Sequence, residues 1–141
     1  MSKIAVGVML IGGVLVGNHY LNKYYSSFEE NNPKLEELKA KLALLEPSFA
    51  KVKMREGTSS YTQGGSYITL KLRDSEGQYF DDNTLFFAVL HELTHTLVRC
   101  GGGDHTGGHC STFVTTFHDL LRKASDQGLY DEVLGIDKEY E

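Results

Sequence analysis

Residues 84–98 read TLFFAVLHELTHTLV and contain the pattern His91-Glu92-Leu93-Thr94-His95. On an α-helix each residue turns by about 100°, so two histidines four positions apart share one face and can reach a single metal ion. Glu92 is offset by one residue from His91, which directs its carboxylate toward the open position of a bound zinc ion. The stretch therefore predicts a helix that carries two zinc ligands and a general base.

The residues around this pattern are largely apolar. They indicate a helix that is buried in a core and holds its ligands rigidly. The plain alternative is a buried helix whose two histidines only contact polar neighbours. The apolar positions are Leu85, Phe86, Val89, Leu90, Leu93 and Leu97.

Two further histidines follow in the glycine-rich segment GGGDHTGGH at residues 101–109. A metzincin pattern would need a histidine at position 101, where Gly101 stands. His109 shares a helical face with Phe113 and Phe117, so it should point inward with the residues of the core. His105 has no such anchor and is the alternative third ligand. The predicted site is therefore one Zn²⁺ ion held by His91, His95 and His109.

The segment from residue 33 to residue 141 predicts one small α+β domain. Asn32-Pro33 is a helix start, and leucines recur after it at spacings of three and four. Alternating apolar residues at 52–54 and 67–73 predict strands, and Gly64-Gly65 predicts a hairpin, so we expect a small antiparallel sheet before the metal helix. The last strand is the candidate edge strand for an extended substrate, and an ordinary scaffold strand is the alternative.

The N-terminal residues differ from the rest of the chain. Residues 4–16 are all apolar or glycine, and the run through residue 21 reaches the short end of the length of about 20 residues that spans a bilayer. A signal peptide is the alternative, but no Ala-x-Ala-like cleavage site follows. We expect a single-pass membrane anchor over residues 1–23, in a host or virion membrane and of undetermined orientation, and a linker over residues 24–32.

Composition limits the partners. The net charge is −5 and no block of lysine and arginine occurs, so a nucleic-acid partner is not expected. Cys100 and Cys110 are too few for a disulfide framework and form no Cys-x-x-Cys pair. They flank the glycine-rich loop closely enough to form a disulfide in an oxidising compartment.

The metal helix, the glycine loop and the sequence Gly108-His109-Cys110-Ser111-Thr112-Phe113 resemble the WLM and SprT-like group of zincin metallopeptidases. Residues 81–85 and the strand and turn before them are also similar to WLM-like proteins of large DNA viruses, so the resemblance covers roughly residues 60–130. The resemblance implies a minimal zincin-like metallopeptidase fold, zinc on His91, His95 and His109, and hydrolysis of a protein or peptide substrate with Glu92 as base. Because the chain lacks a basic DNA-binding extension, the DNA–protein crosslink repair of some relatives is not implied.

The rival interpretation is a membrane-anchored structural protein, such as a virion component, whose zinc ion is not catalytic. Both interpretations use the three histidines, but only the enzyme needs Glu92. Spacing does not identify a second group that would stabilise the oxyanion of the reaction. His105, Arg99 and Tyr61 are the candidates for that role.

Overall fold

The computed structural model describes residues 32–101 and 107–140. These residues form a small α+β domain with a three-stranded sheet and three α-helices, as the sequence predicts. The elements are α3 (Pro33–Leu45), the 3-10 helix η1 (Pro47–Lys51), β1 (Lys53–Gly57), β2 (Tyr61–Gln63), β3 (Tyr67–Lys71), α4 (Asp82–Leu97) and α5 (Ser111–Asp126).

Helix α3 begins and ends where its sequence dictates. The Asn32 side chain accepts a hydrogen bond of 2.9 Å from the Lys34 backbone N–H, and Pro33 occupies the first helical position, where no N–H is needed. The helix ends at Leu45, before Glu46 and Pro47, because a residue that precedes proline avoids the helical conformation. The leucine stripe of α3 is buried, as predicted: Leu35, Leu38, Leu42 and Leu45.

The sheet is mixed, with the strand order β1-β3-β2, so the prediction of an antiparallel sheet is wrong in part. The β2–β3 hairpin is antiparallel, and Gly64 and Gly65 in its turn have φ angles of 61° and 69°. β1 pairs with β3 in parallel. In β3 three successive residues, Ile68, Thr69 and Leu70, are buried, and such a strand takes a central place. The predicted edge strand is thus the central one, and β2 is an edge strand.

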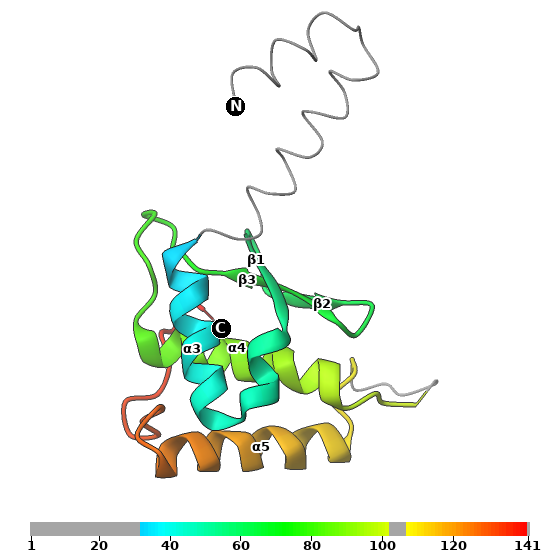
Figure 1. The fold of residues 1–141 in the computed structure, drawn as a ribbon. Coiled ribbons are helices and arrows are strands. Elements are labelled where there is room, and N and C mark those ends of the chain that lie inside the picture. The colour runs from blue at the N-terminus through cyan, green and yellow to red at the C-terminus, as the bar shows by residue number, and fades with distance from the viewer. Residues whose placement is uncertain (1–31, 102–106, 141) are drawn as a thin grey trace, which may run out of the picture.

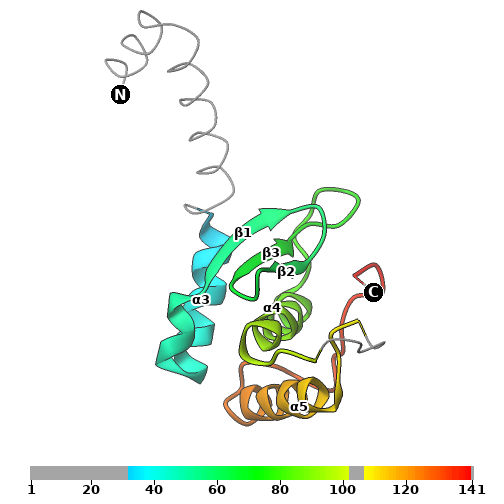
Figure 2. The ribbon, with the colours of Figure 1, turned by 90° about the vertical axis from the view of Figure 1, so that its right-hand side faces the viewer.

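Helix α4 lies in the middle of the domain. Figures 1 and 2 show the sheet on one side of α4 and α5 on the other, with α3 and η1 beside them. The predicted apolar residues of α4 are buried except Leu97, which is 49% exposed because it lies in the last helical turn. This packing holds α4 rigidly between two layers.

The prediction of a membrane anchor over residues 4–21, and with it a single-pass membrane localisation, is corrected. The predicted anchor (1–23) and most of the linker (24–32) lie outside the described residues. Within residues 32–101 and 107–140, no helix combines the length and the apolar character that a bilayer crossing needs. The longest helices, α4 and α5, have 16 residues each and carry charged side chains, whereas a span takes about 20 apolar residues.

Candidate metal centre

The start of α4 is fixed by Asp81. Its carboxylate accepts hydrogen bonds from the backbone N–H of Thr84 at 2.9 Å and from the Thr84 hydroxyl at 2.7 Å, so Asp81 is the N-cap. The Thr84 hydroxyl in turn accepts from the backbone N–H of Asp137. The cap therefore ties the metal helix to the C-terminal segment.

The three predicted histidines lie together. His91 and His95 extend from one face of α4, and His109 lies two residues before the start of α5. The Nε2 atom of His109 is 3.1 Å from Nε2 of His91 and 3.2 Å from Nε2 of His95. All three ligand atoms lie within 4.8 Å of one another. The alternative ligand, His105, lies outside the described residues.

This cluster could hold a metal ion. A tetrahedral zinc ion with Zn–N bonds of 2.0–2.1 Å places two ligand nitrogens about 3.3–3.4 Å apart, close to the distances found here. Without a cation, a single proton on Nε2 of His109 can serve only one of its two contacts with His91 and His95. A three-nitrogen donor set with this spacing therefore fits a zinc ion.

His91 and His95 stay neutral because they are half-buried and lie close to other histidines. Burial, with the added repulsion of His95 and His109, lowers the pKa of His91 to about 4. Burial, followed by the charge of His109, also lowers the pKa of His95. Near neutral pH these two rings therefore keep the lone pairs that a metal ion needs.

Phe113 connects the histidine cluster to the core. Its ring centroid lies 5.1 Å from that of His91, 4.4 Å from that of His95 and 4.8 Å from that of His109. Phe117, one turn later, lies 5.2 Å from His91. Both phenylalanines are buried. Phe113 and Phe117 of α5 thus face inward, as predicted, and His109 packs against Phe113.

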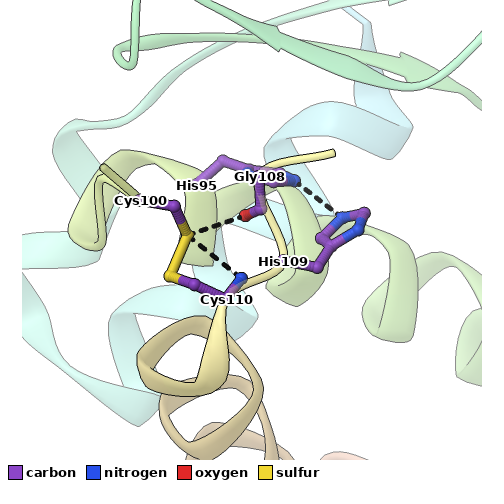
Figure 3. The surroundings of a disulfide bond; sticks show 5 residues. All are labelled: His95, Cys100, Gly108, His109 and Cys110. Carbon is purple, nitrogen blue, oxygen red and sulfur yellow. Dashed lines mark hydrogen bonds between the residues drawn. A yellow bond between two sulfur atoms is a disulfide. The ribbon is translucent and has the colours of Figure 1, made fainter. Parts of the chain in front are cut away.

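A disulfide bond between Cys100 and Cys110 closes the loop that carries His109 (Figure 3). The backbone N–H of Cys110 also donates to Sγ of Cys100 at 3.1 Å. Gly108 has a φ of 85°, and a Cβ atom there would lie 3.4 Å from Cε1 of His95. The disulfide, which the sequence left open, therefore sets where the third histidine approaches the helix.

Glu92 is 6% exposed and lines the same cavity as His91 and His109. The Thr62 hydroxyl of β2 donates to Oε1 of Glu92 at 2.7 Å and lies 3.0 Å from the Glu92 carbonyl oxygen. Burial raises the pKa of the Glu92 carboxyl group, and the hydrogen bond from Thr62 opposes that rise. Sequence reasoning missed Thr62, because only the packing of β2 against α4 brings the two residues together.

The candidates for the group that would stabilise the oxyanion lie in different places. The Tyr61 hydroxyl accepts a hydrogen bond from Arg55 at 3.0 Å, and Arg99 donates to the carbonyl oxygen of Gly64 in the hairpin turn. Tyr140, which sequence reasoning missed, lines the same cavity as His91 and Glu92, and its hydroxyl is hydrogen-bonded to Ser60. Burial, together with the nearby charge of Glu92, raises the pKa of Tyr140.

Two relatives of this chain are uncharacterised proteins of iridescent viruses. Protein 136R of Invertebrate iridescent virus 6 is 37% identical over 95 residues, which cover 65% of this chain and 50% of that protein. Protein 042R of Invertebrate iridescent virus 3 is 40% identical over 84 residues, which cover 59% of this chain and 49% of that protein. The chain therefore spans about half the length of the curated relatives it matches. No protein-family model matches it.

Two crystal structures of Wss1 from Saccharomyces cerevisiae share the fold. One has a TM-score of 0.51 at 23% identity and covers 67% of this chain and 78% of that chain. The other, of a Wss1 mutant, has a TM-score of 0.50 at 24% identity and covers 67% and 79%. Wss1 is a WLM-domain zincin-like protease. The predicted resemblance to this group is confirmed as a likeness of fold. The predicted similarity to proteins of large DNA viruses is confirmed by the two viral relatives.

Proposed function

We propose that this chain is a zinc-dependent metallopeptidase that hydrolyses peptide bonds in a protein or peptide substrate. The convergence of His91, His95 and His109 beside the Glu92 carboxylate is the observation that carries the proposal. The likeness of fold to Wss1 supports it. A zinc ion bound by the three histidines supplies the Lewis acidity that activates water and polarises a peptide carbonyl.

In this proposal Glu92 is the general base. It takes a proton from the attacking water and passes it to the amine that leaves. Burial raises the pKa of the Glu92 carboxyl group above that of an exposed glutamate. A raised pKa suits a group that must both accept and release a proton. Thr62 holds the carboxylate in one orientation through its 2.7 Å hydrogen bond. Tyr140 is the proposed hydrogen-bond donor to the oxygen that becomes negative.

The proposed substrate path runs along β2. This strand is at an edge of the sheet and contacts α4, so an extended peptide that adds to the sheet there would pass the histidines. The net charge of −5 supports a partner other than nucleic acid. Because β3 is central, β2 replaces it as the proposed substrate strand.

The test uses zinc-loaded protein and casein as substrate, with fragments measured by mass spectrometry and zinc measured by metal analysis. Glu92→Gln keeps the shape of the side chain but cannot take a proton, so cleavage should fall by roughly 100- to 10,000-fold while zinc content stays unchanged. The matched control is Glu76→Gln, the same chemical change in an exposed turn. Undiminished cleavage by the Glu92→Gln variant would refute the proposal.

A non-catalytic zinc site is the second candidate. The packing of Phe113 against all three histidines favours it, because an ion there would also fasten α4 to α5. The same experiment separates the two functions. Stoichiometric zinc with no cleavage of casein by the unaltered protein would support the structural role.

A further inference from the structure

The histidine cluster lies between two cavities of different character. One has a volume of about 730 Å³ and is lined by His91, Glu92 and His109 together with apolar side chains. The other, of about 580 Å³, shares these three residues but is otherwise lined mainly by polar and glycine residues of the β2 hairpin and the loop after α4. We call the first one the aromatic cavity. Its apolar walls include Phe87, Phe113, Val114, Phe117 and Ile136.

We propose that the aromatic cavity binds a large apolar side chain of the substrate on one side of the cleaved bond. This inference rests on the proposed peptidase function and names its substrate class. The cavity opens directly at Glu92, so a peptide whose bond lies at the histidines must place a neighbouring side chain there. Its volume is within the range of about 300–1,000 Å³ that is usual for ligand sites.

The charges of the lining disfavour a basic occupant, and its apolar walls favour an apolar one. Among the lining residues that the structure describes, Glu92 is the one carboxylate, and it has the proposed role of base. Besides His91 and His109, the described lining residues include Lys71 and His118, and the Lys71 ammonium lies over the Phe80 ring at 5.6 Å. A lysine or arginine of the substrate would therefore meet no carboxylate except Glu92, whereas an apolar side chain would cover apolar walls.

The walls are preformed. Phe87 and Phe117 meet edge to face with centroids 5.1 Å apart, and Phe113 lies 6.0 Å from Phe117. The same two rings, Phe113 and Phe117, pack against His91. A rigid wall loses little entropy when a side chain binds, so it can discriminate by shape. Substitution of these phenylalanines would also disturb the histidines, so they are poor positions for a test.

Val114 offers a cleaner test. It is on α5, lines the aromatic cavity and is 40% exposed, so a substitution there does not remove a core residue. Burial of this exposed apolar surface by a substrate side chain is favourable. Thr115, the next residue, is exposed on the same helix and is outside the lining of the cavity. Val114→Glu and Thr115→Glu therefore place the same new charge inside and outside the cavity.

Binding is measured first, so that the result does not depend on cleavage. Full-length, zinc-loaded Glu92→Gln protein is titrated with fluorescent peptides that differ at one central residue, which is phenylalanine, glycine or lysine. We expect the phenylalanine peptide to bind at least about 10-fold more tightly than the glycine peptide. Adding Val114→Glu should abolish this preference and strengthen binding of the lysine peptide, whereas adding Thr115→Glu should change neither.

Cleavage by the unaltered protein is then profiled with a mixture of peptides of random sequence. We expect large apolar residues to be enriched at one, and only one, of the two positions that flank the cleaved bond. Cleavage without that enrichment would overturn the inference and leave the peptidase function standing. Selective binding of phenylalanine without any cleavage would support the cavity and refute the peptidase. The absence of both selective binding and cleavage would overturn both.

Discussion

The hydrogen bond from Thr62 to Glu92 makes a prediction about the pH dependence of cleavage. Thr62→Val removes the hydroxyl group but keeps the branched shape of the side chain, so the 2.7 Å bond to Oε1 and the 3.0 Å contact with the Glu92 carbonyl oxygen are lost. A hydrogen bond to a charged group is worth about 1.5–3 kcal/mol, and a pKa unit corresponds to about 1.4 kcal/mol. Because this bond favours the charged carboxylate, its loss should move the acidic limb of the profile upward by about one to two pH units.

The assay is kcat/KM for one fluorogenic peptide, measured between pH 4 and pH 9 on the unaltered protein, Thr62→Val and Thr62→Ser. The sign follows from the role of Glu92: the base works when ionised, so a harder ionisation costs activity on the acidic side and leaves the plateau nearly unchanged. Thr62→Ser keeps a hydroxyl group and should behave like the unaltered protein. Superimposable profiles for Thr62→Val and the unaltered protein, at equal zinc content across the pH range, would refute this reasoning.

Three further predictions concern the metal and the fold. His109→Ala should weaken zinc binding by more than about 100-fold, because loss of a residue that only hydrogen-bonds to a metal ligand already lowers metal affinity roughly 10- to 100-fold. A zinc titration by calorimetry would check this. In the metal-free protein the pKa of His91 is about 4, against 6.5 for an ordinary histidine, so the unfolded chain binds more protons between these values. Chemical denaturation should therefore show that the free energy of unfolding falls from pH 6.5 to pH 4. The raised pKa of Glu92 works in the opposite direction, because the folded protein then binds more protons there than the unfolded chain. The fall should therefore be larger in Glu92→Gln. Replacing Cys100 and Cys110 by serine should lower the free energy of unfolding by about 3 kcal/mol, the loop-closure value for a separation of 10 residues, and should also weaken zinc binding because His109 adjoins the bond.

The clustering of the three histidines could be predicted from the sequence largely because helical periodicity indicates which way each of them faces. That His91 and His95 share one face follows from the helical repeat of α4 alone. His109 needs the repeat of α5, whose phenylalanines at positions 113 and 117 indicate which way the first turn faces. Each of these inferences uses residues within one turn or two of the histidine concerned. The convergence of the two helices then follows from the shared burial of their apolar faces.

The partner of the base could not be found in this way, because it depends on the order of strands. In the predicted antiparallel sheet β3 would be the edge strand, and it would present Ile68 or Leu70, which carry no hydroxyl group, to α4. In the mixed sheet β3 is inserted between β1 and β2, and Thr62, the cross-strand neighbour of Ile68, comes to lie beside Glu92. The strand order therefore decides which side chain lies beside the Glu92 carboxylate. Tyr140 reaches the cavity by a contact with Ser60 across 80 positions of the chain, for which no local pattern exists.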